Sequence, residues 1–438
     1  MTALSVVIAA ASLAGAISMR PVDIEVKPFE DTGTALFPDF DDPAKAASLE
    51  VIAWDEDEAR YITFKVEQKD GSWVIPSHND YPADGTEHMG KAASSFIDVK
   101  KDIVQSDRPE DHAAFGVIDP EEGEGKGEGT GQHILIKDAS GTPLVDVIVG
   151  DDVPNKDGFR YLRLPGEKRV YASRIKLEVS TDFTDWIEDD LLLLEKDDIV
   201  TVISDAYTVD EAAGQVTGRD PLVAELGKDP ADPESTEDWR EKPVEGQAPL
   251  PGKVLDPLVV KRVIGAADRL KIVGVRPRPQ VLTLQALQSK GFFVTQDGRR
   301  LFGNEGELKL ANKDGVVYTL YFGEVAEGTG RALTAGVEDP KAPKPAEGDD
   351  PLAEKQSSRY MFVDVNYDPA VDKTLAVAEG ATPPAPEESE GYKRTEKLRQ
   401  RFDQWFYVIS DDSFQQMRKT RADYFKDAPA EKKDDKTG

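Results

Sequence analysis

The chain of 438 residues contains no cysteine and only four histidines, His78, His88, His112 and His133. The lack of cysteine excludes disulfides, thiolate metal sites, thiol nucleophiles and a lipid-modified N-terminal cysteine. Basic side chains are also few, 54 against 84 acidic ones, which gives a net charge of −30. Because this charge repels phosphate backbones, we expect no binding to nucleic acid.

Sequence patterns for catalysis and cofactor binding are missing as well. The glycine-rich run at 123–131 breaks both phosphate-loop patterns, because Lys126 is followed by Gly127 and glutamates stand between the glycines. Residues 151–158 resemble a calcium loop, but Leu164 stands where the last ligand, a glutamate, is needed. No G-x-S-x-G and no H-E-x-x-H pattern occurs. We therefore predict no catalytic, cofactor-binding or metal residues, no cofactor, and surface histidines in preference to a metal site.

A run without charged side chains occupies residues 3–19. As a helix it would span about 25 Å, just short of a hydrocarbon core of about 30 Å. We predict an N-terminal transmembrane anchor or signal segment at 1–21, and prefer a single-pass anchor to a cleaved signal peptide or a buried helix. Arg20 and Lys27 follow the run and no basic residue precedes it, which favours a cytoplasmic domain if taken literally. A Pro- and Asp-rich tether is predicted at 22–47.

Residues 48–195 are predicted to form a first α+β unit. Alternating apolar residues predict a three-stranded meander over 48–55, 59–68 and 73–75. Asp84 is expected to begin a helix whose buried face includes Phe96 and Ile97. A short helix that ends at Gly116 and two hairpins complete this unit.

The same order of elements recurs in residues 196–375, the predicted second α+β unit. Landmarks recur at nearly one offset: 172 residues from Asp84 to Asp256, 175 from Gly116 to Gly291, 174 from Gly141 to Gly315 and 173 from Gly150 to Gly323. This regularity favours an internal duplication over a chance likeness of two α+β segments. The predicted fold is therefore α+β, with two tandem related units, each of antiparallel strands with two packed helices, plus a C-terminal helix.

The remaining segments are assigned from composition. An acidic, Pro-rich insert interrupts the second unit at 337–356, and a low-complexity linker follows at 376–392. Residues 393–425 are predicted as a helical segment and 426–438 as a disordered tail. Four aromatic residues near the end of the chain are assigned to core packing in preference to a partner groove: Phe402, Trp405, Phe406 and Tyr407.

Short motifs accompany these elements in a fixed order: Trp73-Val74-Ile75-Pro76, Pro82-Ala83-Asp84, Phe115-Gly116-Val117, Asp119-Pro120, Gly150, Arg160-Tyr161, Val170-Tyr171 and Asp185-Trp186. In this order they resemble a bacterial membrane-anchored domain-of-unknown-function family (number four-three-four-zero), over about residues 48–195. The resemblance implies one N-terminal transmembrane helix and an association with gliding-motility-type ABC-transporter auxiliary proteins. It implies no catalytic residues.

From the resemblance we expect a membrane-anchored, extracytoplasmic accessory or scaffold protein of an ABC-type transport complex, without enzymatic activity. Its expected location is the inner membrane, single-pass, with the large domain in the periplasm. The expected partners are the membrane, through the N-terminal helix, and ABC-transporter permease or auxiliary subunits. The alternative is a secreted enzyme with an acidic cleft or a glycan-binding protein. The sequence leaves a small-molecule ligand open.

Overall fold

The computed structural model describes residues 31–55, 59–122, 127–210, 215–232, 234–279, 281, 283–295, 298–328, 330–336, 358–375 and 385–428. The predicted membrane segment at 1–21 and the insert at 337–356 lie outside these residues, as do parts of the predicted tether, linker and tail. Within the described ranges, no helix combines the length and the apolar character needed to cross a bilayer.

The first half of the chain forms a nine-stranded antiparallel sheet, because alternating apolar residues give its strands one buried face. On the strand at 46–55, for example, Leu49 and Val51 are fully buried while their neighbours are partly exposed. In spatial order the strands are β4 (Tyr81–Pro82), β3 (Ser72–Ile75), β2 (Arg60–Lys69), β1 (Ala46–Asp55), β6 (Gln132–Asp138), β7 (Pro143–Asp152), β8 (Phe159–Arg163), β9 (Val170–Arg174) and β5 (Ile103–Ser106).

The second half forms an eight-stranded antiparallel sheet. In spatial order its strands are β14 (Asp238–Glu241), β13 (Leu222–Gly227), β10 (Ile199–Asp205), β19 (Glu307–Asn312), β20 (Val316–Ala326), β21 (Ser358–Tyr367), β22 (Trp405–Ser410) and β16 (Ile272–Pro277). Three two-stranded ribbons accompany it: β11 (Thr208–Asp210) with β12 (Gln215–Thr217), β15 (Lys253–Leu255) with β23 (Phe425–Asp427), and β17 (Phe292–Val294) with β18 (Leu301–Gly303).

The strand orders of the two sheets correspond position by position. The series β3, β2, β1, β6, β7, β8, β9, β5 has the same connections along the chain as β14, β13, β10, β19, β20, β21, β22, β16. Irregularities recur as well, since the register of β7 shifts after Val149 and that of β20 after Phe322. Gly150 and Gly323 lie at these shifts, where a Cβ atom would come 2.3 and 2.2 Å from a backbone carbonyl oxygen.

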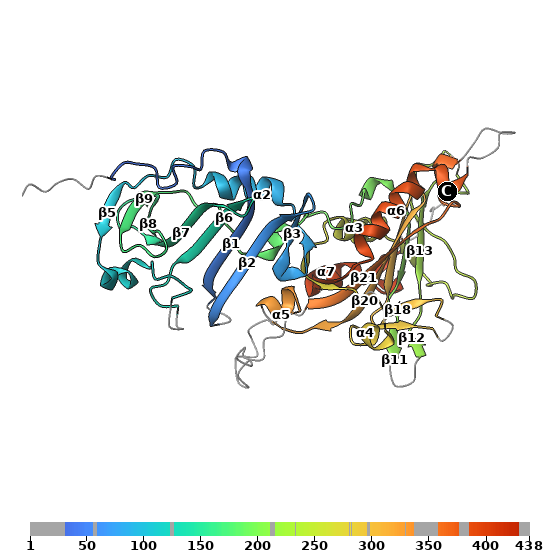
Figure 1. Cartoon of the computed structure of the whole chain (residues 1–438). Helices are drawn as coiled ribbons and strands as arrows, with labels where there is room; N and C mark the ends of the chain where they lie inside the picture. The colour runs from blue at the N-terminus through green and yellow to red at the C-terminus, as the bar shows by residue number, and fades with distance from the viewer. Residues whose placement is uncertain are drawn as a thin grey trace, which may run out of the picture.

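Helices cover the sheets mainly on one face (Figure 1). α2 (Gly85–Ser94) packs on β1 and β3, while α6 (Glu390–Phe402) packs on β21 and β20. α3 (Pro257–Asp268) lies against α7 (Asp411–Met417), and the short α4 (Leu284–Gln288) and α5 (Gly330–Thr334) lie beside β17 and β16. The α+β class expected from the sequence is therefore confirmed.

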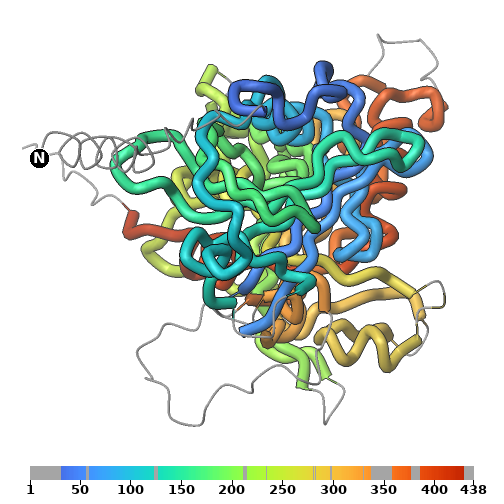
Figure 2. The backbone as a smooth tube through the Cα atoms, turned by 60° about the vertical axis from the view of Figure 1, so that its left-hand side comes forward, coloured from blue at the N-terminus to red at the C-terminus, as the bar shows by residue number. Residues whose placement is uncertain are grey.

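The two sheets lie side by side along the molecule (Figure 1), and in the turned view the first lies in front of the second (Figure 2). Residues between β9 and β10 fill the junction, where Trp186, Leu191 and Leu192 are buried in a core cluster shared by both halves. The Tyr81 ring meets the Trp405 ring edge to face, with centroids 4.9 Å apart. Burial across the junction joins the halves into one body.

Four boundary predictions are wrong. Residues 31–47 are not a free tether, because Leu36 and Phe40 are buried in the core and Leu36 N donates to Val99 O. The linker at 376–392 ends earlier than predicted, since Ser389 caps α6.

The predicted helical segment at 393–425 is interrupted, because α6 ends at Phe402 and 405–410 form β22. At 425–427 β23 takes the first residues of the predicted tail.

Candidate functional site

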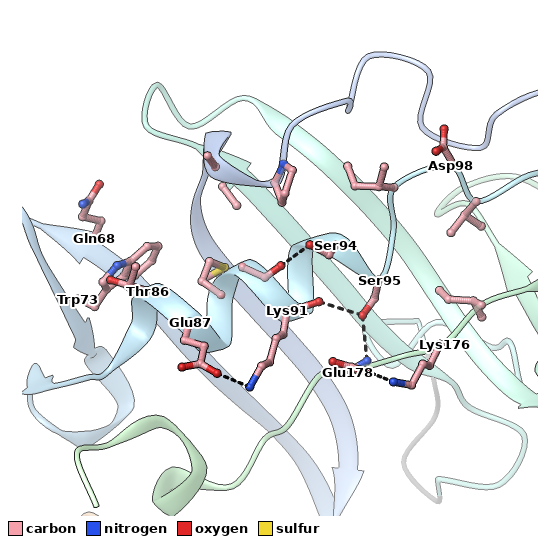
Figure 3. Close-up of a pocket in the computed structure, with 18 of the residues that line it drawn as sticks. Gln68, Trp73, Thr86, Glu87, Lys91, Ser94, Ser95, Asp98, Lys176 and Glu178 are labelled. Atoms are coloured by element: carbon pink, nitrogen blue, oxygen red, sulfur yellow. Dashed lines mark hydrogen bonds and ion pairs between the residues drawn. The ribbon is translucent and has the colours of Figure 1, made fainter.

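A groove with a volume of about 980 Å³ runs along α2 (Figure 3). Trp73 of β3 lies at one end, where the helix begins. Gly85 permits this arrangement, because a Cβ atom there would come 2.5 Å from the Trp73 ring. The opposite wall is formed by residues 174–178, which follow β9.

The walls of the groove are joined by polar contacts. Ser95 Oγ donates to Lys91 O at 3.2 Å and accepts from Glu178 N at 2.9 Å, which ties the end of α2 to the opposite wall (Figure 3). Lys91 Nζ lies 2.6 Å from Glu87 Oε1 on the next turn of the helix. This hydrogen bond lowers the pKa of Glu87 and raises the pKa of Lys91, so both groups stay charged over the physiological range.

The charges of the groove balance one another, although the whole chain is strongly acidic. Its charged lining residues are three acidic and three basic ones: Glu87, Asp98, Glu178, Lys91, Arg174 and Lys176. Between them, Met89 is buried and Ile97 is half-buried in the apolar floor. A surface of this kind suits a polypeptide segment with apolar side chains and charges of both signs.

The prediction of four surface histidines is wrong for two of them. His78 is 3% exposed and stacks on Phe183, with centroids 4.2 Å apart. Its Nε2 is 2.9 Å from Thr334 Oγ1 of α5, so it lies between the two halves of the molecule. Burial, assisted by Arg331 and Arg276, lowers the pKa of His78 to about 4. His88 and His112 are partly exposed, as expected.

His133 is 8% exposed and lies among carboxylates. Its Nε2 is 2.8 Å from Asp146 Oδ1, and its Nδ1 is 3.5 Å from Asp119 Oδ1. Glu121 completes a group with Asp119 and His133 in which one ligand atom from each residue lies within 4.8 Å of the others. The hydrogen bond to Asp146 raises the pKa of His133, against the effect of burial, and Asp119 acts in the same direction. Sequence spacing missed this group because its members come from a loop and a strand.

The other segments weighed in the sequence show no grouping of this kind within the described residues. Residues 123–126 of the glycine-rich run lie outside them. At 151–158 the chain forms a turn at the end of β7, where Asp152 pairs with Arg160 of β8 at 3.3 Å. The four C-terminal aromatic residues are buried in the core, between 0 and 6% exposed: Phe402, Trp405, Phe406 and Tyr407. Core packing is therefore confirmed for them.

Comparison with known proteins adds one match. Residues 73–238 match the model of a family described as a domain of unknown function (DUF4340). Neither the curated proteins nor the solved structures contain a match to the chain. The matched stretch begins at Trp73 in β3 and ends one residue before Trp239 in β14, the strand with the corresponding place in the second sheet. Residues 73–238 are therefore similar to the DUF4340 family, which the motifs of the chain also resemble.

Proposed function

We propose that this protein is a membrane-anchored, extracytoplasmic accessory or scaffold of an ABC-type transport complex, without enzymatic activity. The observation that carries the proposal is the groove along α2, which is open, large and lined by balanced charges. Groups that already pair with each other, such as Glu87 and Lys91, offer contacts to a partner surface and are not arranged as a catalytic pair.

We further infer that the two halves are tandem units related by duplication. The shared strand order supports this inference, and so do the register shifts at Gly150 and Gly323. The family match supports it too, because it runs from a tryptophan in one sheet to the residue before the corresponding tryptophan in the other. Duplication would give the scaffold two similar frames, of which only the first carries this groove among the described residues.

The alternative, an enzyme with an acidic cleft or a glycan-binding protein, has less support. An acidic cleft needs an excess of carboxylates on a concave surface. The groove along α2 instead contains as many basic as acidic side chains. The excess negative charge of the chain therefore lies outside this groove.

Site-specific photocrosslinking in native membranes tests the proposed partner site. A photoreactive residue is placed at Thr86 or Ser94, which are exposed positions lining the groove, and at Asp157, an exposed control position on the turn after β7. We expect Thr86 and Ser94 to crosslink to a permease or auxiliary subunit, identified by mass spectrometry, and Asp157 not to do so. Equal labelling from all three positions, or labelling of none, would contradict the proposal.

Protease accessibility tests the proposed location. In intact spheroplasts, added protease should digest the large domain while a cytoplasmic marker protein survives, because we place the domain outside the inner membrane. Deletion of residues 1–21 should release the protein from the membrane fraction. If the domain resists the protease until the cells are lysed, it lies in the cytoplasm, which would contradict this part of the proposal.

A further inference from the structure

A second group of residues that can carry chemistry lies outside the groove, at the loop that precedes β6. Asp119 and Glu121 lie on this loop, which a bridge between Ile118 and Thr130 holds in place. His133 lies at the start of β6, and Asp146 lies on the neighbouring strand β7. Three chain segments therefore bring one imidazole and three carboxylates together.

Burial makes this arrangement costly unless a positive charge compensates it. The Asp119 side chain is 6% exposed and the His133 side chain 10% exposed. Asp119 Oδ1 accepts one hydrogen bond, from Glu121 N at 3.0 Å. A carboxylate with so little access to water and a single backbone donor retains a large desolvation cost.

The contact with Asp146 determines which nitrogen of the His133 ring carries the proton. A carboxylate only accepts hydrogen bonds, so Nε2 must carry the proton in the 2.8 Å contact. The other nitrogen, Nδ1, is buried and has no hydrogen-bond partner. In a neutral imidazole its lone pair points toward Asp119 Oδ1, 3.5 Å away. Two acceptors in such a contact require either a second proton or a cation between them.

We propose that Asp119, Glu121 and His133 bind a divalent transition-metal cation, with Asp146 orienting the imidazole. The donor set of one nitrogen and two carboxylates suits Zn²⁺ or Mn²⁺ better than Ca²⁺ or Mg²⁺, which take oxygen ligands. In a tetrahedral zinc site with bonds of about 2.0–2.1 Å, ligand atoms lie roughly 3.3 Å apart. The observed 3.5 Å between Nδ1 and Asp119 Oδ1 is close to this spacing.

The site has the second layer of contacts that metal-binding histidines need. Their second ring nitrogen usually donates to a carboxylate, which fixes the tautomer and makes the ligand more basic. Asp146 supplies that carboxylate, and its side chain is 44% exposed. Glu121 is exposed and Asp119 buried, so a cation can reach Nδ1 from the solvent side.

Titration of the purified full-length chain in detergent with Zn²⁺, Mn²⁺ or Co²⁺, after treatment with a chelator, tests the proposal. We expect one equivalent to bind to the wild type, and Co²⁺ to show the intense visible bands of a low-symmetry site. Asp119→Asn and His133→Gln should each abolish this binding. Asp146→Asn should weaken it about 10- to 100-fold, the effect typical of an orienting carboxylate.

Two variants keep the test independent of folding. Glu121→Gln changes an exposed side chain, so it should weaken binding at least tenfold while the unfolding midpoint of the metal-free protein stays unchanged. His112→Gln is the matched control, since the His112 ring contacts Lys168 O, outside the cluster, and its removal should leave metal affinity unchanged. Binding that survives Glu121→Gln and His133→Gln would show that the metal attaches elsewhere on the acidic surface. Absence of binding to the wild type would overturn the proposal.

Discussion

Replacement of Phe96 by alanine gives the sharpest test of how the first unit is held together. Phe96 follows α2 directly, is 1% exposed, and packs in the main core with Met89 and Ala93. Its ring also meets the edge of Phe37, with centroids 5.9 Å apart and planes at 80°. Phe37 belongs to the segment at 31–47, so this contact joins that segment to the helix.

The expected cost follows from this burial. Truncation of a buried phenylalanine to alanine costs about 3–5 kcal/mol, the sum of lost transfer energy and a cavity. The edge-to-face contact with Phe37 contributes about 0.5–1.5 kcal/mol of such a loss. With a urea m-value of about 3 kcal/mol/M, the unfolding midpoint should fall by about 1–1.7 M. The assay is urea unfolding of the full chain in detergent, followed by circular dichroism.

Two controls separate packing from a general effect of mutation. Phe96→Leu keeps most of the buried volume and should lower the midpoint much less than Phe96→Ala. Lys91→Ala removes an exposed side chain of the same helix region, so its midpoint should match the wild type. Equal shifts for Phe96→Ala and Lys91→Ala would refute the assignment of the buried face.

Two further predictions concern the repeated glycines and the buried histidine. Gly150→Ala and Gly323→Ala should each destabilise the fold by about 1–3 kcal/mol in the same urea assay, because the added Cβ would overlap a carbonyl oxygen. Gly227→Ala should be close to neutral, because no atom lies near the position of its Cβ. Neutral effects of both Gly150→Ala and Gly323→Ala would show that close packing does not require glycine at the register shifts. His78 has a folded-state pKa of about 4, below the ordinary histidine pKa of about 6.5, so it contributes stability above pH 6.5 that is lost as the pH falls toward 4. The loss should be about 3 kcal/mol over that window and absent in His78→Gln; parallel pH profiles of the two proteins would contradict it.

Much of this fold could be predicted from the sequence, because apolar alternation marks its strands and glycine or Asp-Pro marks the ends of its helices. Alternation along β2 places Phe64 and Val66 on the buried face, and Gly116 ends its short helix in a left-handed conformation. Asp256 caps α3 through its side chain, as the Asp-Pro pair predicts. In this helix Val260 is fully buried, while Leu258 is 64% exposed.

The features that were missed depend on contacts between distant residues. The run at 405–409 consists only of aromatic and aliphatic residues, and such a run fits a buried helix and a central strand equally well. Pairing with β16 and β21 makes this segment a strand, β22. Leu36 and Phe40 stand in a polar, Pro-containing segment, where two apolar residues give no periodicity. The His133 group has no linear motif, because only folding brings Asp119 and Asp146 to the ring.

The position of β22 between β21 and β16 has a consequence for the order of events during synthesis. β16 is an edge strand whose only neighbour in the sheet is β22, at 405–410. At 5–20 residues per second, the ribosome needs roughly 7–25 s to make the intervening chain. During that time the second unit presents an open edge, whereas β5 of the first unit obtains its partner β9 after about half as many residues. The first unit can therefore complete its sheet while the edge strand of the second unit still lacks its partner.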